Sequence, residues 1–565
     1  MQKNNKLLRA AKVVAWLAAF TGIILILYYI VGPAAGYMTS DCTDSLRWAQ
    51  ATFESGKLIS DEFYYAAILP FGGNLIFLPF IALFGYSMTA QICGLVVFAL
   101  MFAAALYYLA RGMGQSRLVS GGFVSTVLLI LSSSPKLREI MWEHIFYYNL
   151  GLLFFCFGFG LALRILREGG LRDGIEGGRA IDWTRIAIIS GFSLLAATDG
   201  LQTLVCFTLP LIAGVFAERF FDSDSKLTCR RNLFTAALLA LVGFLSVIGF
   251  LLIDVVSGGV SAGYADAYSE YSAMSGWTNN FLGFFYNWFT LLGVDVAEKT
   301  PLVSSESIVT MIRIFGAILL LVVPVILACR YNKIRSSALR AVIVGHFAVT
   351  AFILFAVTFG KLGGANWRLV PMLGTSVMTS FLGAVELIRQ KKTAMRVGVL
   401  ILAFLILMAC VPALEIAKMP ADYGKNNSWH TVAEELEERG LKYGYANFWW
   451  AEVVTMISGG DVEVANLYAG QRSPMEYNYQ QPHGSYDDKD TDSYFFAVDR
   501  IRKCPDGKLD STAERAGQDI GGVHCRVRAV QFARIRGRGY VRLRFSRKYL
   551  LLRQIKRAFL PSLFF

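Results

Sequence analysis

The stretch MTSDCTDSLRWAQATFESGKL, residues 38–58, follows the first long apolar run of the chain. Two acids in it, Asp41 and Asp44, stand just past residues 13–32, a segment long enough to cross a bilayer. Which side of the membrane these acids face, and what else reaches that side, decides the fold and the chemistry that the sequence predicts.

The composition is that of a polytopic membrane protein. Of 565 residues, 55% are hydrophobic and 17% are charged, and the mean hydropathy is +0.49. A soluble chain of this length carries more charge and lacks repeated apolar runs of about 20 residues. Lys and Arg outnumber Asp and Glu by 54 to 41. The excess lies in short loops and in residues 501–565, and membrane topology and anionic lipid explain this distribution without a nucleic-acid partner.

The apolar runs predict about eleven transmembrane helices. They lie near residues 13–32, 66–110, 118–134, 141–163, 184–198, 201–217, 233–256, 308–328, 341–360, 369–388 and 397–415. The run 66–110 is too long for one helix and is broken by FGYS at 84–87, which predicts a re-entrant piece plus one crossing. The first run is expected to be a retained signal anchor, because it is too long for a signal peptide and lacks a small-x-small cleavage site.

Basic residues in the short loops predict the orientation. One topology places all of them on the cytoplasmic side, with the amino terminus. They are Lys3, Lys6, Arg9, Lys12, Arg111, Arg117, Arg164, Arg167, Arg172, Arg179, Lys226, Arg230, Arg231, Arg330, Lys333, Arg335, Arg340 and RQKK at 389–392. Asp41 and Asp44 are therefore expected outside a plasma (inner) membrane. They share that side with loops 134–144, 257–307 and 360–368.

The predicted architecture has two parts. Residues 1–415 form an α-helical transmembrane domain with external loops 34–65 and 257–307. Residues 416–565 form a small extracytoplasmic α/β domain. The loop 257–307 is long, aromatic and acidic, and it is expected to be either a lid or a pair of interfacial helices.

Within the C-terminal part, WHTVAEELEERG (429–440) has the pattern of an amphipathic helix whose Thr431 and Glu434 form a capping box. YGYANFW and VEVANLY have strand character, with the short helix AEVVTMI between them. After residue 525, Arg-rich stretches alternate with apolar stretches. This pattern is typical of an amphipathic tail on an anionic membrane surface.

The sequence requires no cofactor. No CxxC motif and no His/Cys cluster suggests zinc. The external acids are numerous enough to bind one divalent ion, Mg²⁺ or Mn²⁺, although no ligand spacing demands it. Cys504 and Cys525 are both expected outside, where a disulfide between them is permitted.

Asp41 and Asp44 have two interpretations. In the first they are N-caps of a short surface helix over 41–53, although one helix start needs only one cap. In the second, a carboxylate beside the membrane is partly desolvated, and its pKa is raised. Such a group can take a proton from an acceptor hydroxyl while that oxygen attacks an activated carbon.

Several motifs resemble the GT-C superfamily of integral-membrane glycosyltransferases, which includes the protein O-mannosyltransferases and the lipid A aminoarabinose transferases. They are the first loop DSLRWAQATFESG, the proline-bearing LPFGGNLIFLPFIALFGYSMTAQ with its break, EIMWEHIFYYNLGLLFFCFGFGLALRI with its loop acid, and GANWRLVPMLG. In the last, Arg368 and Pro371 match the group's late element. The chain departs from the group where Leu369 replaces the usual Tyr and where Cys-Thr separates Asp41 from Asp44.

The resemblance implies roles for single residues. Asp44, or else Asp41, is the base that deprotonates the acceptor. Glu143 with His144 orients the acceptor or an optional metal; the alternative is an interfacial polar pair that only ends a span.

The resemblance also implies a donor. Arg368, with Lys361 as a second candidate, holds the phosphate of a polyprenyl-phosphate sugar, because a departing lipid phosphate needs its charge neutralised. The alternative is that both cations bind membrane lipid headgroups.

The function so implied is transfer of a sugar to a hydroxyl of a lipid, glycan or protein acceptor at the outer face, with inversion at the anomeric carbon. A membrane transporter is the main alternative, but charges at the outer edge and the lack of repeated hydropathy disfavour it. A polysaccharide polymerase or an assembly protein of the cell envelope is a further alternative.

Overall fold

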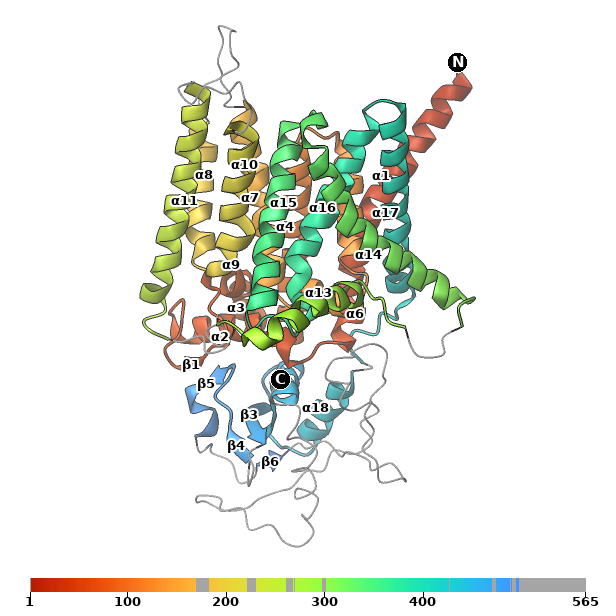
Figure 1. Cartoon of the computed structure of the whole chain (residues 1–565). Coiled ribbons are helices and arrows are strands. Elements are labelled where there is room, and N and C mark those ends of the chain that lie inside the picture. Colours follow the sequence, from red (N-terminus) through yellow and green to blue (C-terminus); the bar gives the residue numbers. More distant parts are fainter. Residues whose placement is uncertain are drawn as a thin grey trace.

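The computed structural model describes residues 2–168, 182–220, 230–260, 268, 270–296, 301–425, 427–469, 474–487, 489 and 494–496. In these parts a bundle of long helices carries a small sheet at one end (Figure 1). The predicted Cys504–Cys525 pair and the tail after residue 525 lie outside the described residues.

Nine helices of the described chain are long and apolar enough to cross a membrane, and there are ten spans if one bent pair is counted. The long helices of the bundle are α1 (Gln2–Val31), α4 (Met88–Gly112), α5 (Arg117–Ile130), α7 (Tyr147–Glu168), α8 (Trp183–Ala197), α10 (Leu209–Phe220), α11 (Arg230–Val256), α14 (Ser305–Cys329), α15 (Ser337–Phe359), α16 (Val370–Ile388) and α17 (Lys392–Lys418). Eleven crossings would require the bent pair and the 15-residue α8, so that number stays a prediction.

Helix α16 lies at the centre of the bundle. Every residue from Val370 to Leu387 is buried, although the helix carries several Ser, Thr and Gly residues. A Cβ on Gly374 would come within 2.5 Å of the Leu152 side chain, and one on Gly383 within 2.2 Å of Leu327. Small residues of this kind let membrane helices approach closely. They explain how neighbouring helices pack against α16 on all sides.

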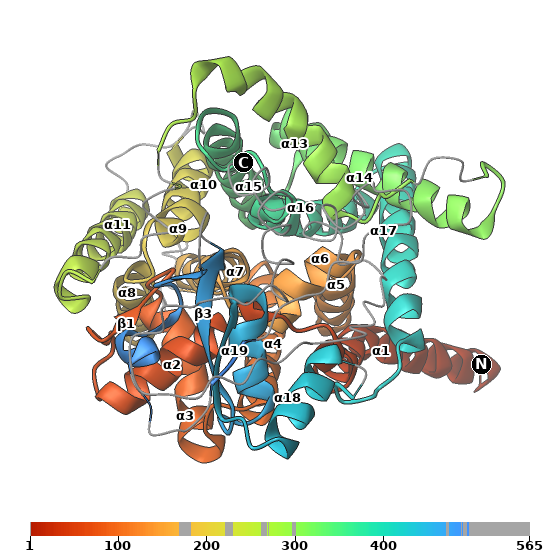
Figure 2. The ribbon, with the colours of Figure 1, turned by 90° about the horizontal axis from the view of Figure 1, so that it is seen from below.

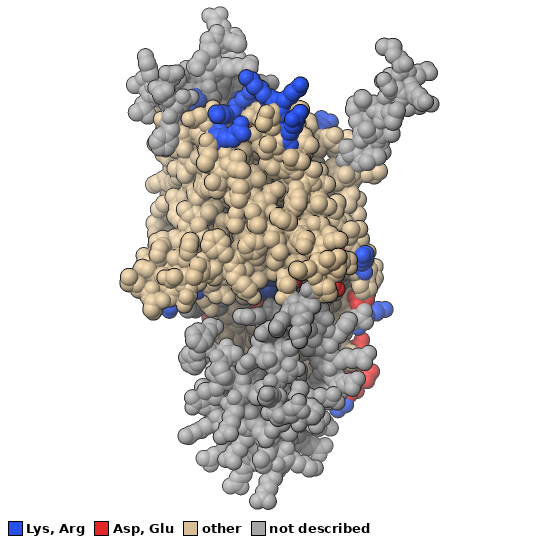
Figure 3. Space-filling model, turned by 45° about the vertical axis from the view of Figure 1, so that its right-hand side comes forward, with Lys and Arg blue, Asp and Glu red and all other residues tan. Residues whose placement is uncertain are grey.

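The two ends of the bundle differ in charge. On the face drawn in Figure 3, Lys and Arg side chains gather at the end opposite the sheet. Below them lies a broad band without charged side chains. We call the other end, formed by residues 33–87 and 131–146 and by the described residues between 419 and 496, the sheet end. The asymmetry is the one that the positive-inside rule predicts.

The first loop folds back against the bundle at the sheet end. It contains η2 (Ser40–Thr43), α2 (Asp44–Ser55), β1 (Phe63–Tyr64), η3 (Pro70–Asn74) and α3 (Leu75–Phe84). Gly85, with φ of +64°, ends α3 before α4 begins. The apolar run 66–110 is thus a short helical piece followed by one long helix, in agreement with the prediction that it is too long for a single helix.

Asp199 secures the start of that short piece. Its carboxylate accepts hydrogen bonds of 2.8 Å from the backbone N–H groups of both Phe71 and Gly72. These groups open η3, where no intrahelical partner exists for them. Asp199, which follows α8, thereby ties the first loop to a distant helix.

The described C-terminal residues form helix α18 (Ser428–Glu438), β2 (Tyr443–Asn447), α19 (Phe448–Ile457), β3 (Glu463–Ala469), β4 (Pro474–Glu476), β5 (Gln481–Pro482), η9 (His483–Tyr486) and β6 (Phe495–Phe496). The larger sheet has the order β4-β3-β2-β6, with β2 parallel to β3 and β6. The predicted capping box of α18 is wrong: Asn427 caps the helix by accepting from the Trp429 N–H at 2.9 Å. Thr431 and Glu434 already lie inside it.

This C-terminal unit rests on the first loop. Strand β5 pairs with β1 in an antiparallel two-stranded sheet. The Val453 N–H of α19 donates to the Ser40 hydroxyl at 3.2 Å. Seen from the sheet end, β3 and α19 lie over α2 and α4 (Figure 2). The unit is therefore anchored directly above the predicted catalytic acids.

The loop after α11 contains α13 (Trp277–Leu291), which runs across the sheet end (Figure 1). Trp288 is buried, and its indole N–H donates to the Ala317 carbonyl at 3.0 Å. Asn287 donates to the Gly363 carbonyl at 3.0 Å. Of the two interpretations of this loop, an interfacial helix agrees with these contacts.

Candidate functional site

The two acids of the first loop lie in different surroundings. Asp41 is in η2 and keeps part of its surface exposed, whereas Asp44, the first residue of α2, is only 6% exposed. The caps of these two helices are Thr39 and Thr43. Neither Asp41 nor Asp44 is therefore the N-cap residue of its helix, and the N-cap interpretation is wrong.

The C-terminal unit covers Asp44. The Trp48 indole N–H donates to the Gln480 amide oxygen at 2.6 Å, and the amide of Gln480 lies beside the Asp44 carboxylate. Burial raises the pKa of Asp44 well above its usual range, and the charges of Asp41 and Glu452 raise it further. Asp44 is thus disfavoured as an ion beneath the covering unit.

A buried ion pair fixes this cover. The Arg47 guanidinium lies 2.7 Å from the Glu452 carboxylate, and the two side chains are 8% and 1% exposed. Tyr86 stacks under Arg47, with 4.7 Å from the guanidinium carbon to the ring centre. Helices α2 and α19 and the turn between α3 and α4 meet at this pair.

Asp41 is the more accessible acid. Burial raises its pKa to about 7; the Glu139 charge raises it too, and the Lys136 charge lowers it. A carboxylate that titrates near neutral pH is suited to take up and release a proton under physiological conditions.

Glu139 and Lys136 come from the second loop. There α6 (Pro135–Arg138) and η4 (Glu139–Glu143) turn by 119° from the direction of α5. Lys136 Nζ lies 2.6 Å from Glu139 Oε2 and 4.9 Å from the centre of the Trp367 ring. One ammonium therefore connects the second loop to the late loop that carries Arg368.

Glu143 is buried inside the bundle. It is 2% exposed and accepts a hydrogen bond from the Tyr29 hydroxyl of α1. Gln91 of α4 donates to the Glu143 carbonyl at 2.9 Å and to the Cys42 carbonyl at 2.6 Å. These contacts lock the two loops together below the surface.

His144 supports Asp41 directly. Its Nδ1 donates to the Asp41 backbone carbonyl at 3.2 Å. Burial lowers the pKa of His144, so the imidazole is neutral and Nε2 carries a lone pair. No partner for Nε2 exists among the described residues.

Arg368 and Lys361 lie differently. Arg368 is buried, donates to the Lys361 carbonyl at 3.0 Å, and stacks on Tyr268 with 4.3 Å from the guanidinium carbon to the ring centre. The Lys361 ammonium instead pairs with Glu270 in solvent, where the two side chains are 45% and 64% exposed. Arg368 is thus buried and held by Tyr268, whereas the Lys361 ammonium is engaged by an acid in solvent.

The site contains an unusual group of buried polar atoms. In the described chain these atoms have no hydrogen-bond partner: Asp44 Oδ1, Gln91 Oε1, His144 Nε2, Arg368 Nε and Gln480 Nε2. Gln91, His144 and Gln480 all contact the first loop that carries the two acids. Because native interiors satisfy almost all buried polar atoms, their unpartnered atoms beside Asp44 Oδ1 mark a place suited to a polar ligand or to ordered water.

Four residues around the candidate site were missed by sequence reasoning. Lys136 and Glu139 are three residues apart in a helical segment, and that spacing predicts an ion pair next to the chosen Glu143. Gln480 and Glu452 carried no sequence signal, because the fold alone brings them to the first loop.

A divalent metal ion does not fit these residues. No three His, Cys, Asp or Glu side chains in the described ranges are grouped so that they could hold one. The acids that approach each other, Asp41 and Glu139, share their surroundings with the Lys136 ammonium, which already neutralises Glu139. The step proposed below therefore uses no metal.

No protein-family model and no curated protein matches the chain. Among solved structures, the chain is similar to the archaeal oligosaccharyltransferase AglB from Archaeoglobus fulgidus, determined in complex with an inhibitory peptide and a dolichol-phosphate. The TM-score is 0.39 at 13% sequence identity, over 80% of this chain and 64% of the AglB chain. A likeness of this size establishes neither a family nor an activity.

Proposed function

We propose that this protein is a GT-C-type glycosyltransferase, which moves a sugar from a polyprenyl-phosphate donor to an acceptor hydroxyl on the outer face of the membrane. The observation that carries the proposal is the placement of Asp41 at the sheet end within reach of the Lys136 charge, with Lys136 also lying over Trp367, the neighbour of Arg368 in the sequence. A base facing phosphate-binding cations is the arrangement that such a transfer needs.

In the proposed step, the Asp41 carboxylate takes the proton of the acceptor hydroxyl. The acceptor oxygen attacks the anomeric carbon, and the bond from that carbon to the phosphate oxygen breaks. The electron pair leaves with the polyprenyl phosphate. Attack from the side opposite the leaving group inverts the anomeric configuration.

The cations act on the leaving group. Arg368 offers a planar guanidinium with an unpartnered Nε, and Lys136 offers a compact point charge. Charge-assisted hydrogen bonds from both would offset the negative charge that grows on the phosphate. Neutral His144 can accept a hydrogen bond at Nε2 from a second N–H or O–H group of the acceptor and so orient the acceptor, while the attacking hydroxyl donates its proton to Asp41.

Asp44, the first choice from the sequence, fits the base role less well. It is buried under Gln480, which raises its pKa and disfavours its ionised form, whereas Asp41 is partly exposed and its pKa is raised to about 7. We assign an indirect role to Asp44. If Asp44 ionised, its negative charge would disfavour the ionised form of Asp41.

The test is donor turnover by the purified full-length protein in lipid nanodiscs. Polyprenyl-phosphate-linked hexoses are supplied, and release of polyprenyl phosphate is measured by chromatography. Consumption of any one donor supports the proposal. If the protein consumes none of them and instead carries a solute across proteoliposomes, the transporter alternative takes its place.

A further inference from the structure

A second site lies in the C-terminal unit, on the outward face of its sheet. Strand β2 alternates Tyr443, Gly444, Tyr445 and Ala446, so both tyrosines point to one face. On the opposite face a Cβ on Gly444 would come within 2.5 Å of the Phe495 ring. The sequence YGYA thus packs one side of the strand tightly and leaves two aromatic rings on the other.

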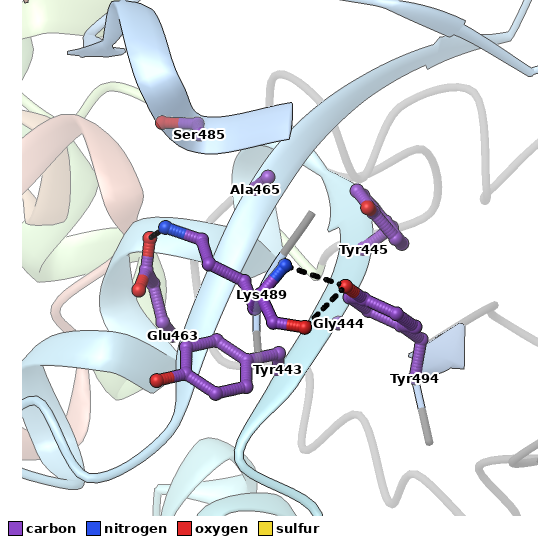
Figure 4. Close-up of a pocket in the computed structure, with 8 residues that line it drawn as sticks. All are labelled: Tyr443, Gly444, Tyr445, Glu463, Ala465, Ser485, Lys489 and Tyr494. Carbon is purple, nitrogen blue, oxygen red and sulfur yellow. Dashed lines mark hydrogen bonds and ion pairs between the residues drawn. The ribbon is translucent and has the colours of Figure 1, made fainter. Parts of the chain in front are cut away.

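The neighbouring strand leaves room between these rings. In the parallel pairing, Glu463 lies beside Tyr443 and Ala465 beside Tyr445. The short Ala465 side chain opens a cleft of about 200 Å³, which Tyr494 and Lys489 close from the far side (Figure 4).

The rings around the cleft are arranged in a stack. Tyr445 lies between Tyr494, with 5.9 Å between ring centres and 27° between planes, and Tyr486, with 6.4 Å and 5°. Tyr494 is held in place by a 2.8 Å hydrogen bond from the Lys489 N–H to its hydroxyl. Flat, fixed rings cost little conformational entropy when they bind a ligand.

The charges in the cleft balance each other. Lys489 Nζ lies 3.2 Å from Glu463 Oε1 and 5.8 Å from the centre of the Tyr443 ring. An anion would be repelled by Glu463, and a cation would compete with Lys489 for the same ring. A neutral ligand with many hydroxyl groups can donate to Glu463, accept from Lys489 and lay its C–H face on a tyrosine.

The cleft is shallow and open to solvent on one side, so a ligand would lie against its rings rather than enter an enclosed cavity. We infer that the cleft formed by Tyr443, Tyr445, Glu463, Lys489 and Tyr494 binds one sugar ring of a neutral glycan.

The cleft is connected to the candidate active site. The Tyr486 hydroxyl accepts from Gln481 Nε2 at 2.6 Å, and Gln481 follows Gln480, which covers Asp44 and holds Trp48. One short segment therefore forms both a wall of the cleft and the cover of the acid. We assign the bound glycan to the acceptor, an assignment that rests on the proposed function.

The experiment measures glycan binding to the full-length protein in nanodiscs, because maltoside and glucoside detergents would themselves compete. The probes are soluble hexasaccharides of α-1,4-glucose, β-1,4-glucose, N-acetylglucosamine and mannose, and an uncharged hexapeptide. Saturation-transfer NMR detects binding, and titration calorimetry gives the affinity. At least one hexasaccharide is expected to bind the wild type.

Tyr445→Ala is expected to weaken that binding at least tenfold, whereas Tyr445→Phe keeps the ring and binds like the wild type. Tyr286→Ala is the matched control, because Tyr286 is an exposed tyrosine on α13. Thermal unfolding checks that each variant is folded, and Lys489→Met serves as a second variant with the same expected direction. Binding by no hexasaccharide, equal binding by folded Tyr445→Ala, or binding of the hexapeptide alone overturns the inference.

The two proposals fail in different ways. If the wild type consumes a lipid-linked sugar but binds no hexasaccharide, the donor reaction stands and the cleft assignment falls. If a hexasaccharide binds with the expected dependence on Tyr445 while no lipid-linked sugar is consumed, the cleft stands as a glycan site and the proposed transfer falls.

Discussion

The Trp48 indole N–H donates to the Gln480 side-chain oxygen at 2.6 Å, across 432 positions of sequence. Through this bond the C-terminal unit covers the first loop and buries Asp44, while Asp41 at the preceding turn stays partly exposed. The bond thus distinguishes two acids that look equivalent in the sequence, since Asp44 is covered and Asp41 stays accessible.

The pH dependence of the reaction should report Asp41. The base must be ionised, and its pKa is raised to about 7. The rate of donor turnover should therefore rise tenfold per pH unit below about 7 and level off above it. Because the Lys136 charge lowers this pKa, Lys136→Met should move the midpoint to higher pH as well as reduce the plateau. A midpoint that is unchanged in Lys136→Met contradicts this coupling.

Arg368 and Lys361 should differ in their effect on turnover. Loss of a donor that stabilises developing charge typically costs roughly 10²–10³ in kcat, and Arg368→Ala should fall in that range. Lys361→Ala should retain near-normal turnover, because Lys361 pairs with the exposed Glu270. Equal losses in the two variants would show that both cations hold the phosphate.

The ion pair of Arg47 with Glu452 should be needed for docking of the C-terminal unit. Removing one partner of a buried pair costs about 3–5 kcal/mol because the other charge stays buried. Arg47→Met should therefore lower the thermal midpoint and expose residues near 420–427 to protease. The double variant Arg47→Met/Glu452→Leu should recover most of the loss, and a double variant as unstable as the single one would argue against this explanation.

Asp199 should matter for stability and leave the pH dependence of turnover unchanged. Its carboxylate accepts two buried backbone N–H groups, and leaving such a group unsatisfied costs about 1–3 kcal/mol. Asp199→Ala should lower the thermal midpoint, with Asp182→Ala as the control, because Asp182 caps the start of α8 and pairs with Arg185, both side chains being partly exposed. A shifted pH profile in Asp199→Ala would instead place this acid in the reaction.

Part of the fold could be predicted from the sequence because its signals are local. Apolar runs of about 20 residues and basic short loops predict the long helices and the asymmetry of the two ends. The alternation in YGYANFW and VEVANLY likewise predicts β2 and β3. The capping box of α18 failed because Asn427, a stronger and earlier cap, takes the helix start.

The site was predicted in part. The sequence identified the first-loop acids, the second loop and Arg368, which the fold brings to the same end of the bundle. It did not distinguish Asp41 from Asp44, because the distinction depends on Gln480 and Glu452, which arrive from the far end of the chain. Long-range contacts of this kind leave no periodic signal in one sequence.

The central claim is that Asp41 is the base of a sugar transfer from a lipid phosphate. It is tested most directly by single-turnover release of polyprenyl phosphate by the wild type, Asp41→Asn and Asp44→Asn. Asp61→Asn is the control, because Asp61 is an exposed acid of the same loop, paired only with Lys57 among the described residues.

Loss of a general base typically costs about 10²–10⁴ in rate. Asp41→Asn should lose at least that lower factor, while Asp44→Asn and Asp61→Asn stay within about tenfold of the wild type. A folded Asp41→Asn variant with near-normal turnover, or a larger loss in Asp44→Asn, contradicts the account.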